Sequence, residues 1–205
     1  MPTIEVSMNA PDGPAAGRHG VHPASRAWLL DNPLRRLLQS PKRIVGRYIS
    51  PGDTVLDIGC GPGFFARPMA AMVGEEGCVI AADLQEEMLA MLAERAGREG
   101  LLDRIRLHRT EPGSPGFTGL GPVDFALAFY VVHEVPDGEG LLREVAVALR
   151  PGGLMLLVEP KDEVAAAEFE RTVRAAEAAG LTVAGTPRIL LSRTALLKKP
   201  VEPGL

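Results

Sequence analysis

The residues best suited to chemistry lie in a glycine-rich turn. A short apolar strand over 54–58 runs into three glycines at alternate positions, Gly59, Gly61 and Gly63. Glycine adopts backbone conformations that other residues avoid, and it lets the backbone approach a ligand closely. An acid, Asp57, stands two residues before the first glycine. A strand, a glycine turn and a following helix together predict a cradle for a nucleotide-like cofactor.

The turn admits two kinds of cofactor. The dinucleotide pattern G-x-G-x-x-G/A can be laid on residues 61–66, with an acid, Asp83, twenty residues after Gly63. That interpretation leaves Gly59 unused and places Asp57 near a pyrophosphate, where a carboxylate is repelled. Asp57 favours a cofactor that carries a cationic group instead, and a nicotinamide dinucleotide stays as the alternative.

Titratable side chains follow two later apolar runs. Tyr130, His133 and Glu134 come after the run at 123–129, and Glu159 ends the next run. Because ligands bind at the carboxyl edge of an open α/β sheet, these residues are candidates for acid–base chemistry there. Histidine titrates near neutral pH and is the natural base. The alternative is that His133 only hydrogen-bonds or caps its own loop, and Glu159 has the same two readings.

The elements that must position these residues alternate between strand and helix signals. Strands are predicted at 54–58, 78–82, 104–108, 123–129 and 153–158, and helices at 64–73, 85–98, 138–149 and 162–179. Nearly continuous apolar strands suit a parallel sheet buried on both faces. Two strand-like runs in the tail, 182–191 and 195–198, predict a closing hairpin with an antiparallel strand. The expected fold class is therefore α/β, a doubly wound, seven-stranded, mostly parallel sheet.

An N-terminal helical cover is expected to precede this sheet. Residues 1–23 are rich in proline, glycine and alanine without clear periodicity, which predicts a loose arm. Between 25 and 48, apolar residues recur every three or four positions, and Pro33 and Pro41 are placed to begin helical segments. This segment covers a sheet edge or forms a lid over the ligand cleft, with Trp28 as one apolar wall.

These expectations divide the chain into two parts of one globular unit. Residues 1–50 form the arm and helical lid, and residues 51–205 form the cofactor-binding domain.

Composition narrows the classes of protein and partner. The chain has 205 residues, 46% of them hydrophobic and 23% charged, which suits one globular domain with a full core. A net charge of −4 argues against a nucleic-acid partner. The sequence contains no apolar run that is long enough to predict a membrane-spanning helix. Two cysteines, Cys60 and Cys78, make no disulfide framework, so we expect a cytoplasmic location. Neither cysteine has a second thiol or a histidine at metal-ligand spacing, so we expect no metal site. A monomer or a homodimer is expected.

The motifs as a whole resemble the class I S-adenosylmethionine-dependent methyltransferases. The resemblance rests on Asp-x-Gly-x-Gly-x-Gly at 57–63, an acid ending the second strand, an apolar fourth strand ending near His133, and Pro-Gly-Gly at 151–153. It covers residues 44–160 and is close to the small type-11 and ubiquinone-biosynthesis-like branch. The cofactor of that family, S-adenosyl-L-methionine, has no phosphate and carries a cationic amino-acid tail.

The resemblance implies a role for each matching residue. Gly59, Gly61 and Gly63 would lie against the methionine part of the cofactor, and Asp57 would orient its amino group. Asp83 would accept hydrogen bonds from both ribose hydroxyls.

Three further positions complete the implied cofactor site. Leu84 would pack on the adenine, and Phe129 would line the cofactor with its backbone. The family usually has an acid after the third strand, but Thr110 takes that place here, with Glu111 one step on. Thr110 is expected to meet the adenine through its hydroxyl or its backbone.

The expected function is methyl transfer from S-adenosylmethionine to a small-molecule acceptor by in-line displacement. Alignment of the reacting groups supplies about 7–11 kcal/mol of such a barrier. A general base is needed only if the acceptor must lose a proton, and His133, Tyr130 and Glu159 are the candidates. An oxidoreductase that uses NAD, and a non-catalytic partner subunit that keeps the fold, are the alternatives.

Overall fold

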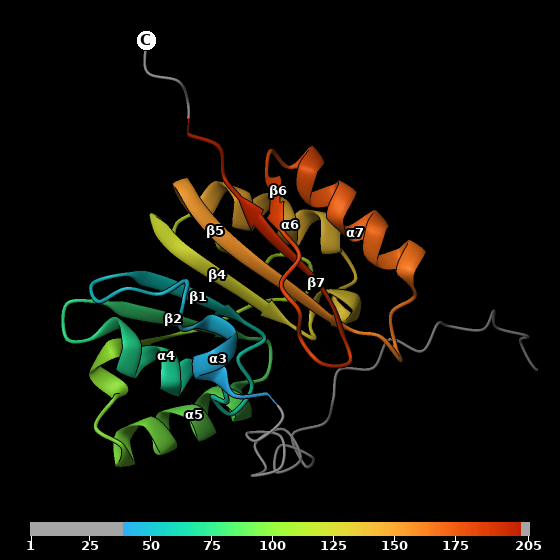
Figure 1. Cartoon of the computed structure of the whole chain (residues 1–205). Coiled ribbons are helices and arrows are strands. Elements are labelled where there is room, and N and C mark those ends of the chain that lie inside the picture. The colour runs from blue at the N-terminus through green and yellow to red at the C-terminus, as the bar shows by residue number, and fades with distance from the viewer. Residues whose placement is uncertain (1–38, 202–205) are drawn as a thin grey trace, which may run out of the picture.

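The computed structural model describes residues 39–201 of the chain. A seven-stranded sheet runs through the middle, with helices on both faces (Figure 1). Its strand order is β3-β2-β1-β4-β5-β7-β6, and only the pairings of β7 are antiparallel. The predicted doubly wound, mostly parallel architecture is confirmed.

The strands agree closely with the apolar runs of the sequence. Their bounds are β1 Thr54–Ile58, β2 Cys78–Asp83, β3 Ile105–Arg109, β4 Val123–Phe129, β5 Leu149–Pro160, β6 Thr182–Gly185 and β7 Ser192–Lys198. The central strands β1 and β4 are buried along nearly their whole length. Continuous burial explains why these strands are apolar at successive positions instead of alternate ones.

The helices form a layer on each face of the sheet. One face carries α3 (Pro41–Val45), α4 (Ala66–Val73) and α5 (Glu86–Arg98), and the other carries α6 (Gly138–Ala148) and α7 (Ala166–Ala178) (Figure 1). Two hydrophobic clusters match these layers, one around Phe125 and Leu92 and the other around Met155 and Leu142. Short 3-10 turns lie at Leu102–Arg104 and Val132–Glu134.

The strand order decides where a ligand can bind. From β1 the chain moves outward to β2 and β3, and then returns to the other side of β1 with β4 and β5. The loops after β1 and β4 therefore diverge to opposite faces and leave a crevice at the carboxyl ends of these two strands.

The N-terminal cover is described only from Gln39 onward. Helix α3 begins at Pro41, as predicted, and Val45 packs into the same core as α4. Tyr48 stacks on Phe125 of β4 with ring centroids 5.6 Å apart. The rest of the predicted cover, with Trp28, lies outside the described residues, and the division at residue 50 stays a prediction.

Several element boundaries were predicted wrongly, and three of them are instructive. Strand β5 begins at Leu149, not 153, because Gly152 and Gly153 pair through their backbones with Lys199. Helix α7 begins at Ala166, not 162, and a turn precedes it. Strand β6 ends at Gly185, so residues 186–191 of the predicted run are not strand. Within that segment the Pro187 carbonyl accepts a hydrogen bond from the Thr194 hydroxyl instead of pairing in the sheet.

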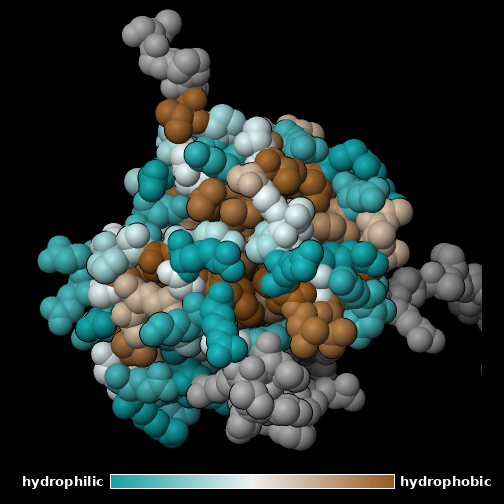
Figure 2. Space-filling model, viewed as in Figure 1, coloured by the Kyte–Doolittle hydropathy of each residue, from teal (hydrophilic) through white to brown (hydrophobic). Residues whose placement is uncertain are grey.

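The surface seen in Figure 2 is hydrophilic near its edges, with apolar groups gathered toward its middle. Large exposed apolar side chains among the described residues include Val183, Leu190 and Leu191. None of the helices within residues 39–201 is long and apolar enough to cross a bilayer.

Candidate active site

A cavity of about 350 Å³ lies at the carboxyl ends of the parallel strands. The glycine turn after β1 and the loop after β2 form one part of its wall, and the loops after β3, β4 and β5 form the rest. The cavity is therefore at the crevice that the strand order predicts, and most of the predicted site residues line it.

The three glycines of the turn have different roles in the structure. All three have positive φ, at 66° for Gly59, 51° for Gly61 and 89° for Gly63. A Cβ at Gly59 would lie 2.6 Å from Val131 Cγ2, and one at Gly63 would lie 2.4 Å from Leu92 Cδ1. Glycine at these two positions is needed for packing within the protein.

Gly61 differs from its two neighbours because its missing side chain faces open space. It lines the cavity, and a Cβ built on it would meet no atom of residues 39–201 within 4 Å, apart from its own chain neighbours. Gly61 is therefore the position at which glycine leaves room for a ligand. Gly63 does not line the cavity, so its predicted contact with a cofactor stays a prediction.

Asp83 fixes the glycine turn from the end of β2. Its Oδ2 accepts a hydrogen bond from the Gly61 backbone N–H at 2.8 Å, and its Oδ1 accepts one from Gln85 at 2.9 Å. Burial raises the pKa of this carboxyl, and the hydrogen bonds from Gln85, Gly61 and Leu84 oppose that rise. Each carboxylate oxygen keeps a lone pair for a further donor, as a pair of ribose hydroxyls requires.

Asp57 lies deeper than the cavity wall. It is buried in β1 and is 2% exposed. Burial raises the pKa of the Cys60 thiol well above its usual value, and the charges of Asp57 and Asp83 raise it further. Cys60 is therefore an unreactive thiol. Asp57 lies behind the glycine turn and not in the cavity wall.

The remaining predicted cofactor positions line the cavity. Leu84 and Thr110 do so, and the Thr110 backbone N–H donates to the Asp83 carbonyl at 3.0 Å. Phe129 is also in the wall, with its ring centroid 4.6 Å from that of Phe65. This contact packs the carboxyl end of β4 against the glycine turn.

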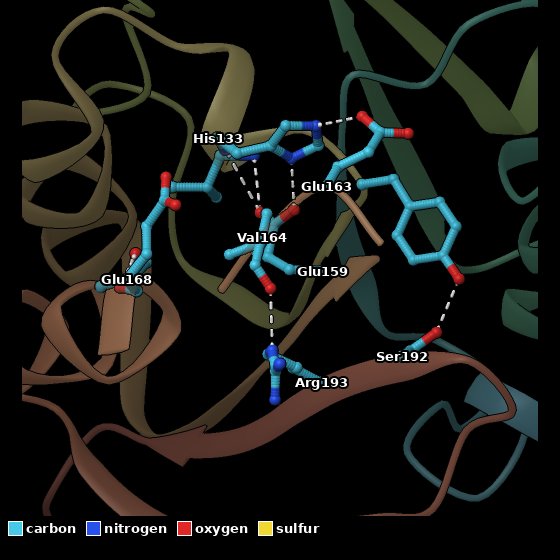
Figure 3. Close-up of polar contacts among 10 residues, drawn as sticks. His133, Glu159, Glu163, Val164, Glu168, Ser192 and Arg193 are labelled. Carbon is cyan, nitrogen blue, oxygen red and sulfur yellow. Dashed lines mark hydrogen bonds and ion pairs between the residues drawn. The ribbon is translucent and has the colours of Figure 1, made fainter. Parts of the chain in front are cut away.

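His133 and Glu159 meet beside the cavity (Figure 3). The Glu159 Oε2 lies 2.5 Å from His133 Nδ1, and its Oε1 accepts hydrogen bonds from the backbone N–H groups of Val132 and His133. Glu159 is 1% exposed and does not line the cavity, whereas His133 does. Glu159 therefore orients the imidazole instead of facing a ligand itself.

The other imidazole nitrogen of His133 faces Glu163. Nε2 lies 3.3 Å from Glu163 Oε2, and both residues line the cavity. Burial lowers the pKa of His133, but the hydrogen bond and charge of Glu159, with the charges of Glu134 and Glu163, outweigh it and raise the pKa. The ring is thus held ready to carry a proton in a site that can receive a ligand.

Tyr130 is held away from His133 by its own partners. Its hydroxyl lies 2.6 Å from Ser192 Oγ and accepts a hydrogen bond from Gln39 Nε2 at 2.9 Å. Tyr130 has φ of 62°, a backbone conformation that residues other than glycine rarely adopt. Tyr130 is part of the cavity wall, and its predicted catalytic role stays a prediction.

Sequence reasoning missed Glu163, Val131 and Ser192. Glu163 was assigned to a helix, but it lies in the turn after β5 and so returns to the cavity. An acid four residues after Glu159, at the carboxyl end of a parallel strand, is a signal that could have found it. The contacts of Val131 and Ser192 have no comparable signal in the sequence.

Among the described residues, no group of three potential ligands is placed to hold a metal.

Fold and site together define a class. A doubly wound sheet that closes with an antiparallel β7, a glycine turn, and an acid at the end of β2 are the features of a class I S-adenosylmethionine-dependent methyltransferase. Residues 55–153 match the methyltransferase domain family. A solved S-adenosylmethionine-dependent methyltransferase from Aquifex aeolicus is 25% identical, with a TM-score of 0.76 over 87% of this chain and 98% of that one. The chain thus belongs to this class.

The relatives with the most similar sequences include methyltransferases of quinone biosynthesis. A ubiquinone biosynthesis O-methyltransferase of Caulobacter sp. (strain K31) is 33% identical over 147 residues, covering 72% of this chain and 55% of the relative. A ubiquinone/menaquinone biosynthesis C-methyltransferase of Teredinibacter turnerae is 29% identical over 111 residues, covering 54% of this chain and 44% of the relative. The chain spans about half the length of these relatives.

The cofactor of this class, S-adenosylmethionine, fits the residues at the glycine turn. Gly61 leaves open space in the wall, and Asp83 offers two carboxylate oxygens beside it. The buried Asp57 places a carboxyl group behind the turn, which in its ionised form suits a cationic ligand. A dinucleotide would bring its pyrophosphate to the turn in front of Asp57, so Asp57 fits S-adenosylmethionine better than NAD, whereas Asp83 fits the ribose of either cofactor.

Proposed function

We propose that the protein transfers a methyl group from S-adenosylmethionine to a hydroxyl oxygen of a small, largely apolar molecule. The observation that carries the proposal is the placement of His133, which lines the same cavity as Gly61 and Asp83. When bound, S-adenosylmethionine supplies an electrophilic methyl on a sulfonium sulfur, so that an O–C bond forms, the C–S bond breaks and its electron pair stays on sulfur.

The residues of the chain have separate tasks under this proposal. Gly59, Gly61 and Asp83 hold the cofactor, with Leu84 and Thr110 beside its adenine. His133 bonds the acceptor oxygen through Nε2 and holds the proton that this oxygen loses. Glu159 is a positioning residue, because it fixes the imidazole through Nδ1 and does not reach the cavity.

The acceptor side of the cavity supports a small molecule with an apolar body. Its walls include Val131, Val135, Pro136, Leu141 and Pro160. Such walls bury an aromatic or alkyl group and exclude water from the reacting oxygen. The name of the Caulobacter relative, an O-methyltransferase of ubiquinone biosynthesis, is consistent with an acceptor of this kind.

Methyl transfer to matched acceptors tests the proposal. The protein is incubated with S-adenosylmethionine and, separately, with 4-ethylcatechol, 4-ethylaniline or 4-ethylthiophenol, and methylated products are identified by mass spectrometry. We expect O-methylation of the catechol, a loss of kcat in His133→Gln and Glu159→Gln, and wild-type kcat in the control Asp162→Asn. Methylation of the aniline or thiophenol without the catechol would overturn the assignment of oxygen.

Two further outcomes separate the alternatives. Weak or absent binding of S-adenosylhomocysteine, together with no methyl transfer to any probe, would favour a non-catalytic partner subunit. Binding of NADH without binding of S-adenosylhomocysteine would favour an oxidoreductase.

A further inference from the structure

Glu163 occupies the position at which an acceptor oxygen would meet His133. Its Oε2 lies 3.3 Å from His133 Nε2, the only imidazole nitrogen that Glu159 leaves available. Both side chains line the cavity, and the Glu163 side chain is 53% exposed while that of His133 is 14% exposed. The exposed partner can therefore turn away into solvent, whereas the imidazole is held in place.

We propose that the Glu163 carboxylate stands in for the acceptor oxygen in the free protein, and that the acceptor binds as a single oxyanion in its place. This inference rests on the proposed function. It names the substrate class more closely: a phenol or enol with an acidic hydroxyl, which exchanges with a carboxylate on the same imidazolium.

Charge around the cavity supports the exchange of one anion for another. His133 faces three carboxylates: Glu159 from β5, Glu163 from the turn after β5, and Glu134 from its own 3-10 turn. These carboxylates favour the protonated imidazole. In the part of the chain that the structure describes, His133 is also the only cavity-lining side chain that can carry a positive charge.

The same walls limit the acceptor to one negative charge. Glu134 and Asp137 line the acceptor side of the cavity beside apolar residues. A second anionic group, such as a carboxylate or a phosphate, would meet these acids without a cation among the described lining residues. The expected acceptor therefore has one ionised oxygen on an apolar body.

Histidine NMR tests the exchange without any need for catalysis. The chain has four histidines, so the His133 signal can be assigned by its loss in His133→Gln. Removing the carboxylate in Glu163→Ala should lower the pKa of His133 by about half a unit, as a partly exposed ion pair allows. Sodium formate, a small carboxylate, should raise it again, whereas sodium chloride at equal ionic strength should not.

A matched control separates the local contact from general charge. Asp162→Asn removes a carboxylate from the same turn, and we expect it to leave the pKa of His133 unchanged. An unchanged pKa in Glu163→Ala, or equal effects of formate and chloride, would overturn the proposal.

Binding of a chromogenic phenol tests the substrate class. 4-Nitrocatechol ionises near neutral pH, and its visible absorbance reports its ionisation. In the presence of S-adenosylhomocysteine, we expect the ionised form to bind, about two- to fivefold more tightly to Glu163→Gln than to the wild type. Weaker or equal binding to Glu163→Gln, or binding of the neutral form, would contradict the inference.

The two proposals fail in different ways. If formate restores the pKa of His133 but no hydroxyl probe is methylated, the anion position stands and the proposed function fails. If a catechol is methylated but His133 does not respond to Glu163→Ala, the proposed function stands and this inference fails.

Discussion

Replacing Gly61 by alanine tests the cofactor cradle most directly, because the protein itself leaves room for the new methyl group. Among the described residues, and apart from its chain neighbours, a Cβ at this position meets no atom within 4 Å, and Gly61 lies in the wall of the cavity. The Gly61 N–H that bonds Asp83 is kept in the variant. Gly61→Ala should therefore affect the bound cofactor much more than the fold.

Two effects of different size are expected. Alanine at φ of 51° is strained by roughly 1–2 kcal/mol, partly offset by a less flexible unfolded chain. A net loss of about 1 kcal/mol lowers the Tm of a chain of this size by about 2–4 °C. Inserting a methyl group into a packed contact costs about 1–3 kcal/mol. This cost raises the Kd of S-adenosylhomocysteine by about 5- to 150-fold.

Titration calorimetry with S-adenosylhomocysteine and thermal unfolding measure the two effects separately. Gly52→Ala is the matched control, because Gly52 also has a positive φ, 88°, and open space around its Cβ, but lies outside the cavity. It should lose a similar Tm and keep full affinity. Wild-type affinity in a folded Gly61→Ala would refute our assignment of the cofactor to this turn.

Three other substitutions probe the rest of the site. Asp83→Asn should weaken S-adenosylhomocysteine by at least about tenfold in calorimetry, since an amide offers one acceptor oxygen where two are needed; unchanged affinity would remove the ribose role. His133→Gln should lose most stability relative to the wild type below about pH 6.5, with the difference shrinking as the pH rises through the raised pKa of the folded state; urea titrations showing a difference that grows with pH would reverse this sign. Tyr130→Phe should lower the free energy of unfolding by about 1–2 kcal/mol through its lost hydrogen bonds to Ser192 and Gln39 and leave affinity for S-adenosylhomocysteine intact; a fall in kcat beyond about a hundredfold would restore Tyr130 as a catalytic residue.

The glycine-turn side of the cavity, where we propose that the cofactor binds, was predictable because its sequence signals are local. Gly59, Gly61 and Asp83 are each tied to the end of an apolar strand, so strand periodicity alone places them at one edge of the sheet. The element order followed from the same periodicity. The exact roles within the turn were not predictable, because the contacts of Gly59 with Val131 and of Gly63 with Leu92 join distant segments.

The arrangement of residues after β4 and β5 could not be predicted, because it depends on tertiary contacts that no local sequence pattern indicates. The bond between Tyr130 and Ser192 spans 62 residues, and that between His133 and Glu159 spans 26. Local turn signals also misled, since Pro-Gly-Gly at 151–153 became part of β5 when Lys199 supplied backbone partners. In each case long-range pairing overrode the local preference of the sequence.

The separation of the cavity into two halves has an evolutionary consequence. Loops after β1, β2 and β3 supply the turn, Asp83 and Thr110, while loops after β4 and β5 supply His133 and Glu163. The two sides adjoin where β1 lies beside β4 and where Val131 lies beside Gly59. Under the proposed function, a lineage could exchange residues such as His133 and Glu163 for new acceptors and keep the glycine turn and Asp83, provided that Val131 still fits against Gly59. Substitutions in the loops after β4 and β5 would then remove activity toward one acceptor, while the retained binding of S-adenosylmethionine would allow activity toward another to evolve.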